Sequence, residues 1–176
     1  MKSKIKIVVS EYHYNDVTER MLDTAKEHYV NSNLNFDVSH VPGSFEIPFE
    51  IARSIKEDTI RNEDSIGSFK QKGIKEIRDN IVQMAKLSQL NLDTQSIFSG
   101  YLALGCVIKG KTINHEAIST SIFTNLQRIS IENVIPIGNA IFNANNLKEA
   151  KEKCINCTSH AINTLSILMN LKNEKK

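Results

Sequence analysis

The chain of 176 residues contains no tryptophan, three prolines and only three cysteines. Cys106, Cys154 and Cys157 are an odd number without the spacing of a disulfide framework, which predicts a reducing, cytoplasmic compartment. Cys154 and Cys157 form a C-x-x-C pair, but there is no second pair to complete a zinc site. The sequence therefore predicts neither a disulfide scaffold nor a metal centre.

Long hydrophobic runs and a strong excess of one charge are also missing. No run approaches the roughly 18 apolar residues of a membrane span. The basic first residues are not followed by the hydrophobic region of a signal peptide. Twenty-two basic residues stand against 20 acidic ones, which gives a net charge of +2. This balance predicts no nucleic-acid partner, and the missing apolar run predicts no membrane partner.

Strand and helix patterns alternate along the chain, whose length suits one domain over residues 1–176. Short β-branched runs predict strands, and apolar residues at helical spacing predict helices. Strands alternating with helices indicate a parallel sheet covered on both faces, so the expected fold class is α/β. The expected strands are residues 5–9, 36–38, 101–104 and 134–137, and the expected helices are residues 17–29, a helix from 46 or 48 onward, 118–129, 146–153 and 161–168.

One charged stretch does not follow this alternation. Between Arg53 and Asn80, 13 of 28 residues are charged, seven of them basic and six acidic. Such a composition is typical of a solvated helix face. We therefore expect residues 55–96 to be an inserted, charged helical segment within the single domain.

Ligands of open parallel sheets bind beyond the carboxyl ends of the strands. Four segments should meet there: residues 10–13, 42–46, 105–115 and 138–143.

The third of these segments contains a phosphate-loop pattern. Residues 105–112, GCVIKGKT, match G-x-x-x-x-G-K-[ST]. A nucleoside triphosphatase is the weaker interpretation, because Val107 and Ile108 are typical of a strand and no apolar strand ends in the Asp that would hold magnesium. Lys111 and Thr112 still precede a helix start, which offers N–H groups, a hydroxyl and a helix dipole to some phosphate.

Three other side chains in these segments have both a functional and a purely structural interpretation. His115 has an ordinary pKa of about 6.5, which suits proton transfer, yet a helix cap followed by a surface residue would look the same. Glu46 can hold polyol hydroxyls or simply favour the first turn of a helix. Tyr12 can stack on a flat ring or be an ordinary exposed aromatic.

Three stretches together resemble the 6,7-dimethyl-8-ribityllumazine synthase (lumazine synthase) family: residues 41–48 (VPGSFEIP), 104–112 (LGCVIKGKT) and 136–153. The likeness covers about residues 4–54 and 98–171. It implies a flavodoxin-like three-layer sandwich with a central, mainly parallel four-stranded sheet. The implied reaction joins 5-amino-6-(D-ribitylamino)uracil to 3,4-dihydroxy-2-butanone 4-phosphate, giving 6,7-dimethyl-8-ribityllumazine, phosphate and water in riboflavin biosynthesis. It uses small-molecule substrates and no metal or organic cofactor.

The resemblance also implies roles for residues, matched by position. Asn114 stands where the family's commonest pattern has its catalytic histidine, but a subgroup carries that histidine one place later, so the implied catalytic residue is His115. The residues implied to contact the pyrimidine and its ribityl chain are Tyr12, Ser44, Phe45, Glu46, Cys106, Val107, Ile108 and Asn139, and those implied to bind phosphate are Lys111, Thr112 and Lys153.

Three departures from the family pattern leave an alternative open. The histidine is displaced to His115. Lys153 replaces an arginine, which removes the bidentate fork. Asn139 replaces an aromatic residue contributed across a subunit interface. These features favour, as the alternative, a catalytically weak or silent homologue that binds lumazine or flavin.

The resemblance implies a homo-oligomer, since family members form pentamers, decamers or sixty-subunit shells. Shell-forming members carry a Gly- and Lys-rich loop between the last two helices. Here the four residues from Cys154 to Cys157 replace that loop, which is about four residues shorter in this chain. We therefore expect a pentamer or a decamer.

Overall fold

The computed structural model describes residues 4–67, 97–110 and 114–173. The chain divides into two compact units, residues 1–52 with 98–176, and residues 53–97. Helix α2 (Ile47–Gly67) runs from the first unit into the second. Most of the insertion expected at residues 55–96 lies outside the described residues, so it stays a prediction.

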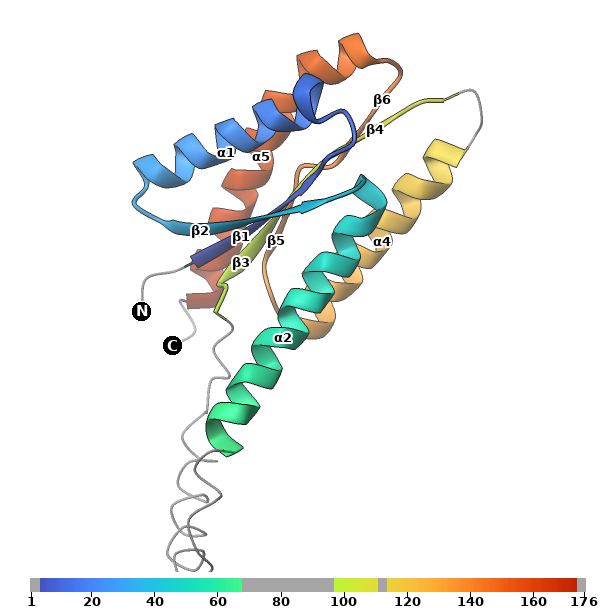
Figure 1. The fold of residues 1–176 in the computed structure, drawn as a ribbon. Coiled ribbons are helices and arrows are strands. Elements are labelled where there is room, and N and C mark those ends of the chain that lie inside the picture. The colour runs from blue at the N-terminus through green and yellow to red at the C-terminus, as the bar shows by residue number, and fades with distance from the viewer. Residues whose placement is uncertain (1–3, 68–96, 111–113, 174–176) are drawn as a thin grey trace, which may run out of the picture. The chain divides into compact units, whose positions relative to one another are not determined.

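A parallel four-stranded sheet in the order β2-β1-β3-β5 forms the centre of the first unit (Figure 1). Strand β1 (Lys4–Ser10) pairs with β2 (Asn35–Val41) on one side and with β3 (Gly100–Leu104) on the other. Strand β5 (Ile137–Asn139) pairs with β3 and completes the sheet. The predicted α/β class and the central parallel sheet are confirmed.

A second, smaller ladder continues beyond the carboxyl end of β3. Strand β4 (Cys106–Ile108) pairs in parallel with β6 (Phe142–Ala144). The first backbone hydrogen bond after this ladder runs from the Lys109 N–H to the Ala144 carbonyl, at 2.8 Å. The chain therefore stays extended and paired immediately after the main sheet ends.

Helices cover both faces of the sheet (Figure 1). Helices α1 (Glu19–Asn31) and α5 (Leu147–Asn173) pack on the face to which β1 contributes Ile5, Ile7 and Val9. The opposite face carries helix α4 (Asn114–Asn133) and the first turns of α2. On that face Lys6 forms an ion pair with Glu50 across 3.7 Å. Odd and even positions of β1 thus face different layers, as a pleated strand requires.

No helix among the described residues is both long enough and apolar enough to cross a membrane.

Helix α5 corrects one expectation. The two helices predicted at residues 146–153 and 161–168 are one continuous helix, and Cys154 to Cys157 lie within it. Residues 147–173 contain no glycine or proline, so nothing in the local sequence ends the helix. The Thr158 hydroxyl also donates to the Cys154 carbonyl, at 2.8 Å, within the continuous turn.

The last expected strand begins later than predicted. Residues 134–136 connect α4 to β5, and Val134 has a left-handed backbone with φ of 48°. The Ile135 N–H donates to the Ser130 carbonyl at 3.1 Å and the Val134 N–H to the Ile131 carbonyl at 3.3 Å. These two bonds form a Schellman motif, which ends the helix and uses the residues that sequence alone assigned to a strand.

Val134 occupies the position at which glycine is usual in this motif, and its side chain is 74% exposed. A β-branched residue at positive φ is strained, so we expect Val134→Gly to raise the free energy of unfolding by about 1 kcal/mol. Urea denaturation followed by circular dichroism measures the change. The matched control is Val30→Gly, an exposed valine with helical backbone in α1, which should lower stability by about 0.5 kcal/mol. A loss of stability in both variants would contradict the assignment of strain.

Candidate active site

Backbone hydrogen bonds hold two of the segments that follow the strands against neighbouring strands. All strands of the central sheet are parallel, so their carboxyl ends lie at one edge. The Glu11 N–H donates to the Val41 carbonyl at 2.8 Å, and the Ala140 N–H donates to the Ala103 carbonyl at 2.9 Å. The segment after β1 is therefore held at the end of β2, and the segment after β5 is held against β3.

Ser44 is the contact between the segment after β2 and the segment after β3. It begins a short 3-10 turn, Ser44–Glu46, and its buried hydroxyl donates to the Cys106 carbonyl at 3.1 Å. Gly105 makes room for this contact, because a Cβ on Gly105 would lie 2.5 Å from the Ser44 Oγ. The Ser44 oxygen can still accept a hydrogen bond, as expected of a ribityl contact.

Phe45 and Glu46 follow Ser44 in the same turn. The Phe45 side chain is 57% exposed. Glu46 folds back over Gly43, since a Cβ on Gly43 would lie 2.9 Å from the Glu46 Oε2. The turn thus presents an open aromatic ring and a carboxylate beside each other at the strand-end edge.

Tyr12 follows β1 directly and is 58% exposed. Its backbone N–H donates to the Ser10 Oγ at 3.2 Å, and its ring meets the His13 ring edge-on with centroids 4.3 Å apart. His13 has a left-handed backbone with φ of 56° and precedes a π-helical turn, η1 (Tyr14–Thr18). Strained backbone and π-helical turns cluster at functional sites, which agrees with an exposed ring available for stacking.

Strand β4 carries the three residues expected to line the pyrimidine. Cys106 and Val107 are buried and Ile108 is half-buried. Burial, with a smaller effect of Cys154, raises the pKa of the Cys106 thiol to about 11. The thiol therefore stays protonated at neutral pH and is a packing group, not a nucleophile.

The paired strand also excludes a wrapped phosphate loop over residues 106–108 of the G-x-x-x-x-G-K-[ST] pattern. Lys111 and Thr112, the expected phosphate-binding residues of this pattern, lie outside the described residues.

His115 is the second residue of helix α4. Its side chain is only 13% exposed, and its Nε2 lies 3.9 Å from the Glu116 Oε1. Asn114, the competing position, is exposed. Ser119, which the sequence alone did not indicate, lies four residues later on the same helix face. Its hydroxyl donates to the His115 carbonyl at 2.7 Å. The helical spacing from His115 is the signal that could have indicated it.

Asn139 and Lys153 are each held by a local partner. The exposed Asn139 accepts a hydrogen bond from the Ile141 N–H at 2.9 Å. Lys153 forms an ion pair and a hydrogen bond with Glu149, one turn earlier in α5. That bond, together with bonds from the Asn145 backbone and side chain, lowers the pKa of the Glu149 carboxyl to about 2. The same pair raises the pKa of Lys153, so both groups are charged at neutral pH.

A helix cap at Asn146 lies in the same region. The Asn146 Oδ1 accepts from the Glu149 N–H at 2.9 Å, while the Glu149 carboxylate reaches back to the Asn145 N–H at 2.8 Å. This cap begins α5 and places Lys153 less than two turns into the helix.

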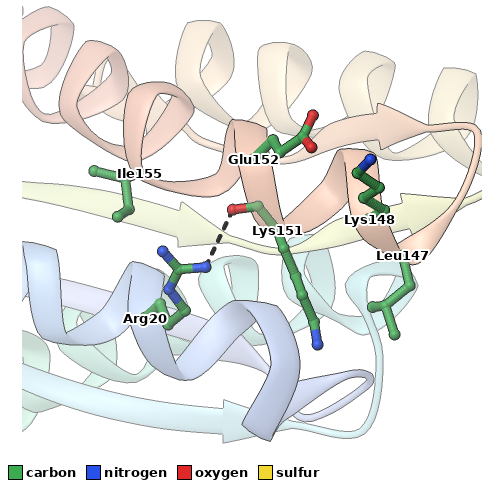
Figure 2. A pocket seen from close by; sticks show the side chains of 6 residues that line it. All are labelled: Arg20, Leu147, Lys148, Lys151, Glu152 and Ile155. Carbon is green, nitrogen blue, oxygen red and sulfur yellow. Dashed lines mark hydrogen bonds between the residues drawn. The ribbon is translucent and has the colours of Figure 1, made fainter.

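A surface hollow lies between α1 and the start of α5, and none of the predicted site residues lines it (Figure 2). The Arg20 guanidinium donates to the Lys151 carbonyl at 3.2 Å, and the Lys151 ammonium pairs with Asp16 at 2.6 Å. The residues that line the hollow are Arg20, Leu147, Lys148, Lys151, Glu152 and Ile155. The lining side chains seen in Figure 2 come from both helices, so the hollow reflects how α1 packs on α5.

Comparison with known proteins decides the family. The sequence model of the 6,7-dimethyl-8-ribityllumazine synthase family matches residues 2–66 and 60–173. The chain belongs to this family. A 6,7-dimethyl-8-ribityllumazine synthase of Bartonella bacilliformis is 25% identical over 144 residues, which cover 82% of this chain and 71% of the relative.

Two further lumazine synthases are similar over a comparable length. That of Afipia carboxidovorans is 26% identical over 147 residues, covering 84% of this chain and 70% of the relative. That of Buchnera aphidicola is 29% identical over 157 residues, covering 86% of this chain and 74% of the relative. The resemblance inferred from the three sequence stretches is confirmed.

The contact between Gly105 and Ser44 can be tested in this lumazine synthase family member. We expect Gly105→Ala to lower the free energy of unfolding by roughly 1–3 kcal/mol, because the new methyl group pushes Ser44 away from the Cys106 carbonyl. Chemical denaturation measures it. The matched control is Gly110→Ala, where an added Cβ meets no described atom within 4 Å. Equal effects at the two glycines would refute the packing role of Gly105.

Proposed function

We propose that this chain condenses 5-amino-6-(D-ribitylamino)uracil with 3,4-dihydroxy-2-butanone 4-phosphate to give 6,7-dimethyl-8-ribityllumazine, phosphate and water. The observation that carries the proposal is the family match over residues 2–66 and 60–173. The strand-end edge supports it, because Ser44 contacts Cys106 there and the segment after β1 carries the exposed Tyr12 ring.

The proposed reaction needs groups that transfer protons and bind the substrates, and the side chains of the proposed site supply them. The pyrimidine amine attacks the ketone, and loss of water gives an imine. Phosphate is then eliminated, and the resulting enol rearranges to a ketone. The ribitylamino nitrogen attacks this carbonyl, and loss of a second water closes the ring. Most of the rate comes from holding two substrates together. His115 moves protons between intermediates, and Lys111, Thr112 and Lys153 hold the phosphate.

We assign Tyr12 to stacking on the pyrimidine, and Ser44, Phe45 and Glu46 to the ribityl chain and ring. The wall of the pyrimidine site is Cys106, Val107 and Ile108, with Asn139 supplied by a neighbouring subunit. The supporting observations are the exposed rings of Tyr12 and Phe45 and the placement of β4 directly beyond β3.

The cell compartment and the insertion are part of the same proposal. All three cysteines are free thiols, which suits a reducing cytoplasm.

We place the charged helical insertion at residues 55–96 within one lumazine-synthase-like domain. Its support is that the unit of residues 1–52 and 98–176 contains β1 to β6.

The direct test mixes both substrates with the purified chain and follows the absorbance of the lumazine product. Formation of product, faster than the uncatalysed mixture, supports the proposal. A chain that binds the lumazine without forming it would be the silent homologue, and the proposed activity would be wrong.

His115 and Asn114 separate the two possible positions of the catalytic histidine. His115→Ala should slow turnover by ~10²–10⁴-fold, the usual contribution of general acid–base catalysis. Asn114→Ala, at the adjacent exposed position, is the control and should have a small effect. Part of the rate survives in both variants because proximity remains. Steady-state kinetics would contradict the assignment if the two variants showed equal, small losses.

We expect Lys153 to affect the binding of the phosphate substrate and not the binding of the pyrimidine. Lys153→Ala is expected to raise the KM for the butanone phosphate roughly tenfold, with little change for the pyrimidine, since a charge-assisted hydrogen bond is lost. Lys153→Arg should retain binding. Lys151→Ala, which removes the same charge two residues earlier from a pair with Asp16, controls for net charge. Weaker pyrimidine binding with normal phosphate binding would show that Lys153 is placed wrongly.

The proposed site needs more than one subunit, because Asn139 and Lys153 are assigned to a neighbour's pocket. A cyclic head-to-tail interface closes into a ring. We therefore expect a homopentamer or a decamer. Light scattering should give a mass of about 99 kDa, five times 19.8 kDa, or twice that value. A stable monomer, or a particle of about one megadalton, would overturn the expectation.

A further inference from the structure

The buried Ser119 hydroxyl connects helix α4 with strand β6. Its side chain is 3% exposed. The Ser119 Oγ lies 2.7 Å from the His115 carbonyl oxygen and 2.6 Å from the Asn143 Oδ1. Both distances are typical of strong O–H···O hydrogen bonds. One hydroxyl group thus links three residues that belong to two separate elements.

One hydroxyl proton serves both of these contacts. The Ser119 hydroxyl is the donor, and the His115 carbonyl and the Asn143 Oδ1 are the two acceptors. The hydroxyl therefore shares its proton between them or donates to each in turn. In either case it holds the His115 backbone close to the Asn143 side chain.

The position of Asn143 determines which parts of the fold these hydrogen bonds connect. Asn143 lies opposite Val107 in the pairing of β6 with β4. Strand β4 carries the proposed wall of the pyrimidine site, whereas His115 belongs to the first turn of α4. The bonds from Asn143 through Ser119 therefore connect strand β6, which is paired with β4, with the backbone of His115.

We propose that Ser119 and Asn143 are positioning residues for His115, which hold the first turn of α4 at a fixed distance from β4. The imidazole is carried by that turn, so its distance from a pyrimidine lying against β4 depends on the two hydrogen bonds. Small displacements of a reacting group cost up to about 10²-fold in rate. This inference rests on the proposed catalytic role of His115.

The test is a double-mutant cycle on kcat. Asn143→Ala should lower kcat about tenfold and change the KM of either substrate by less than about twofold. Asn143 is exposed, so its truncation leaves the core intact. Ser119→Ala is the second arm and should give a similar loss. Combined with His115→Ala, either change should add almost nothing, because both act through the same imidazole.

Asn125→Ala is the matched control. Asn125 donates to the Ser121 carbonyl at 2.8 Å, which is also an asparagine–serine contact on α4, but it lies within the helix. Its loss should leave kcat unchanged. Circular dichroism checks that the variants are folded.

The outcomes separate this inference from the proposed function. If His115→Ala leaves turnover unchanged, the catalytic role of His115 fails, and the positioning role fails with it. If His115→Ala slows turnover while Asn143→Ala does not, the positioning role alone is wrong. It is also wrong if the Asn143→Ala loss is equally large in the His115→Ala background, or if only KM changes.

Discussion

The parallel pairing of β1 with strands on both sides is the constraint on which the rest of the structure depends. Its seven residues pair one-to-one with β2, and five of them pair with β3. A slip of one residue would turn Lys6 toward the apolar layer under α1 and α5, where Ile5 and Ile7 now pack. The register is thus fixed by burial. Because the strands run in one direction, the segments after them meet at one edge.

The strands at that edge were predictable to different degrees, for physical reasons. The β-branched run of β1 is buried and carries its own signal. Strand β2 extends well beyond the expected residues 36–38, because much of it is exposed or half-buried and its extended form depends on pairing with β1. Residues 134–137 contain the same apolar residue types as a strand, but Val134 ends a helix there. The apolar composition of these residues therefore does not distinguish a strand from a helix end, and the hydrogen bonds determine which of the two forms.

The expected break in α5 came from the residue pattern. The helix start at Asn146 and the apolar spacing of residues 161–168 were interpreted as two helices, which left the residues between them unassigned. Residues 147–173 contain no glycine or proline, however, and they form one helix. The candidate site depended on a general rule instead. The rule that ligands bind at the carboxyl ends of parallel strands indicated Tyr12 and Ser44, which follow β1 and β2 at that edge. It could not indicate the bond between Ser119 and Asn143, which joins residues 24 apart through geometry alone.

Partners within the chain already hold several polar groups of the proposed site. The Ser44 hydroxyl donates to Cys106, Asn139 accepts from Ile141, and Lys153 is paired with Glu149. Each still has capacity left: a hydroxyl and an amide oxygen can each accept one more bond, and an ammonium has three donors. A substrate therefore meets side chains whose rotamers are already fixed, so less conformational entropy is lost on binding. Since the proposed reaction depends chiefly on holding two substrates in one geometry, these internal bonds serve catalysis by keeping the site in place before either substrate arrives.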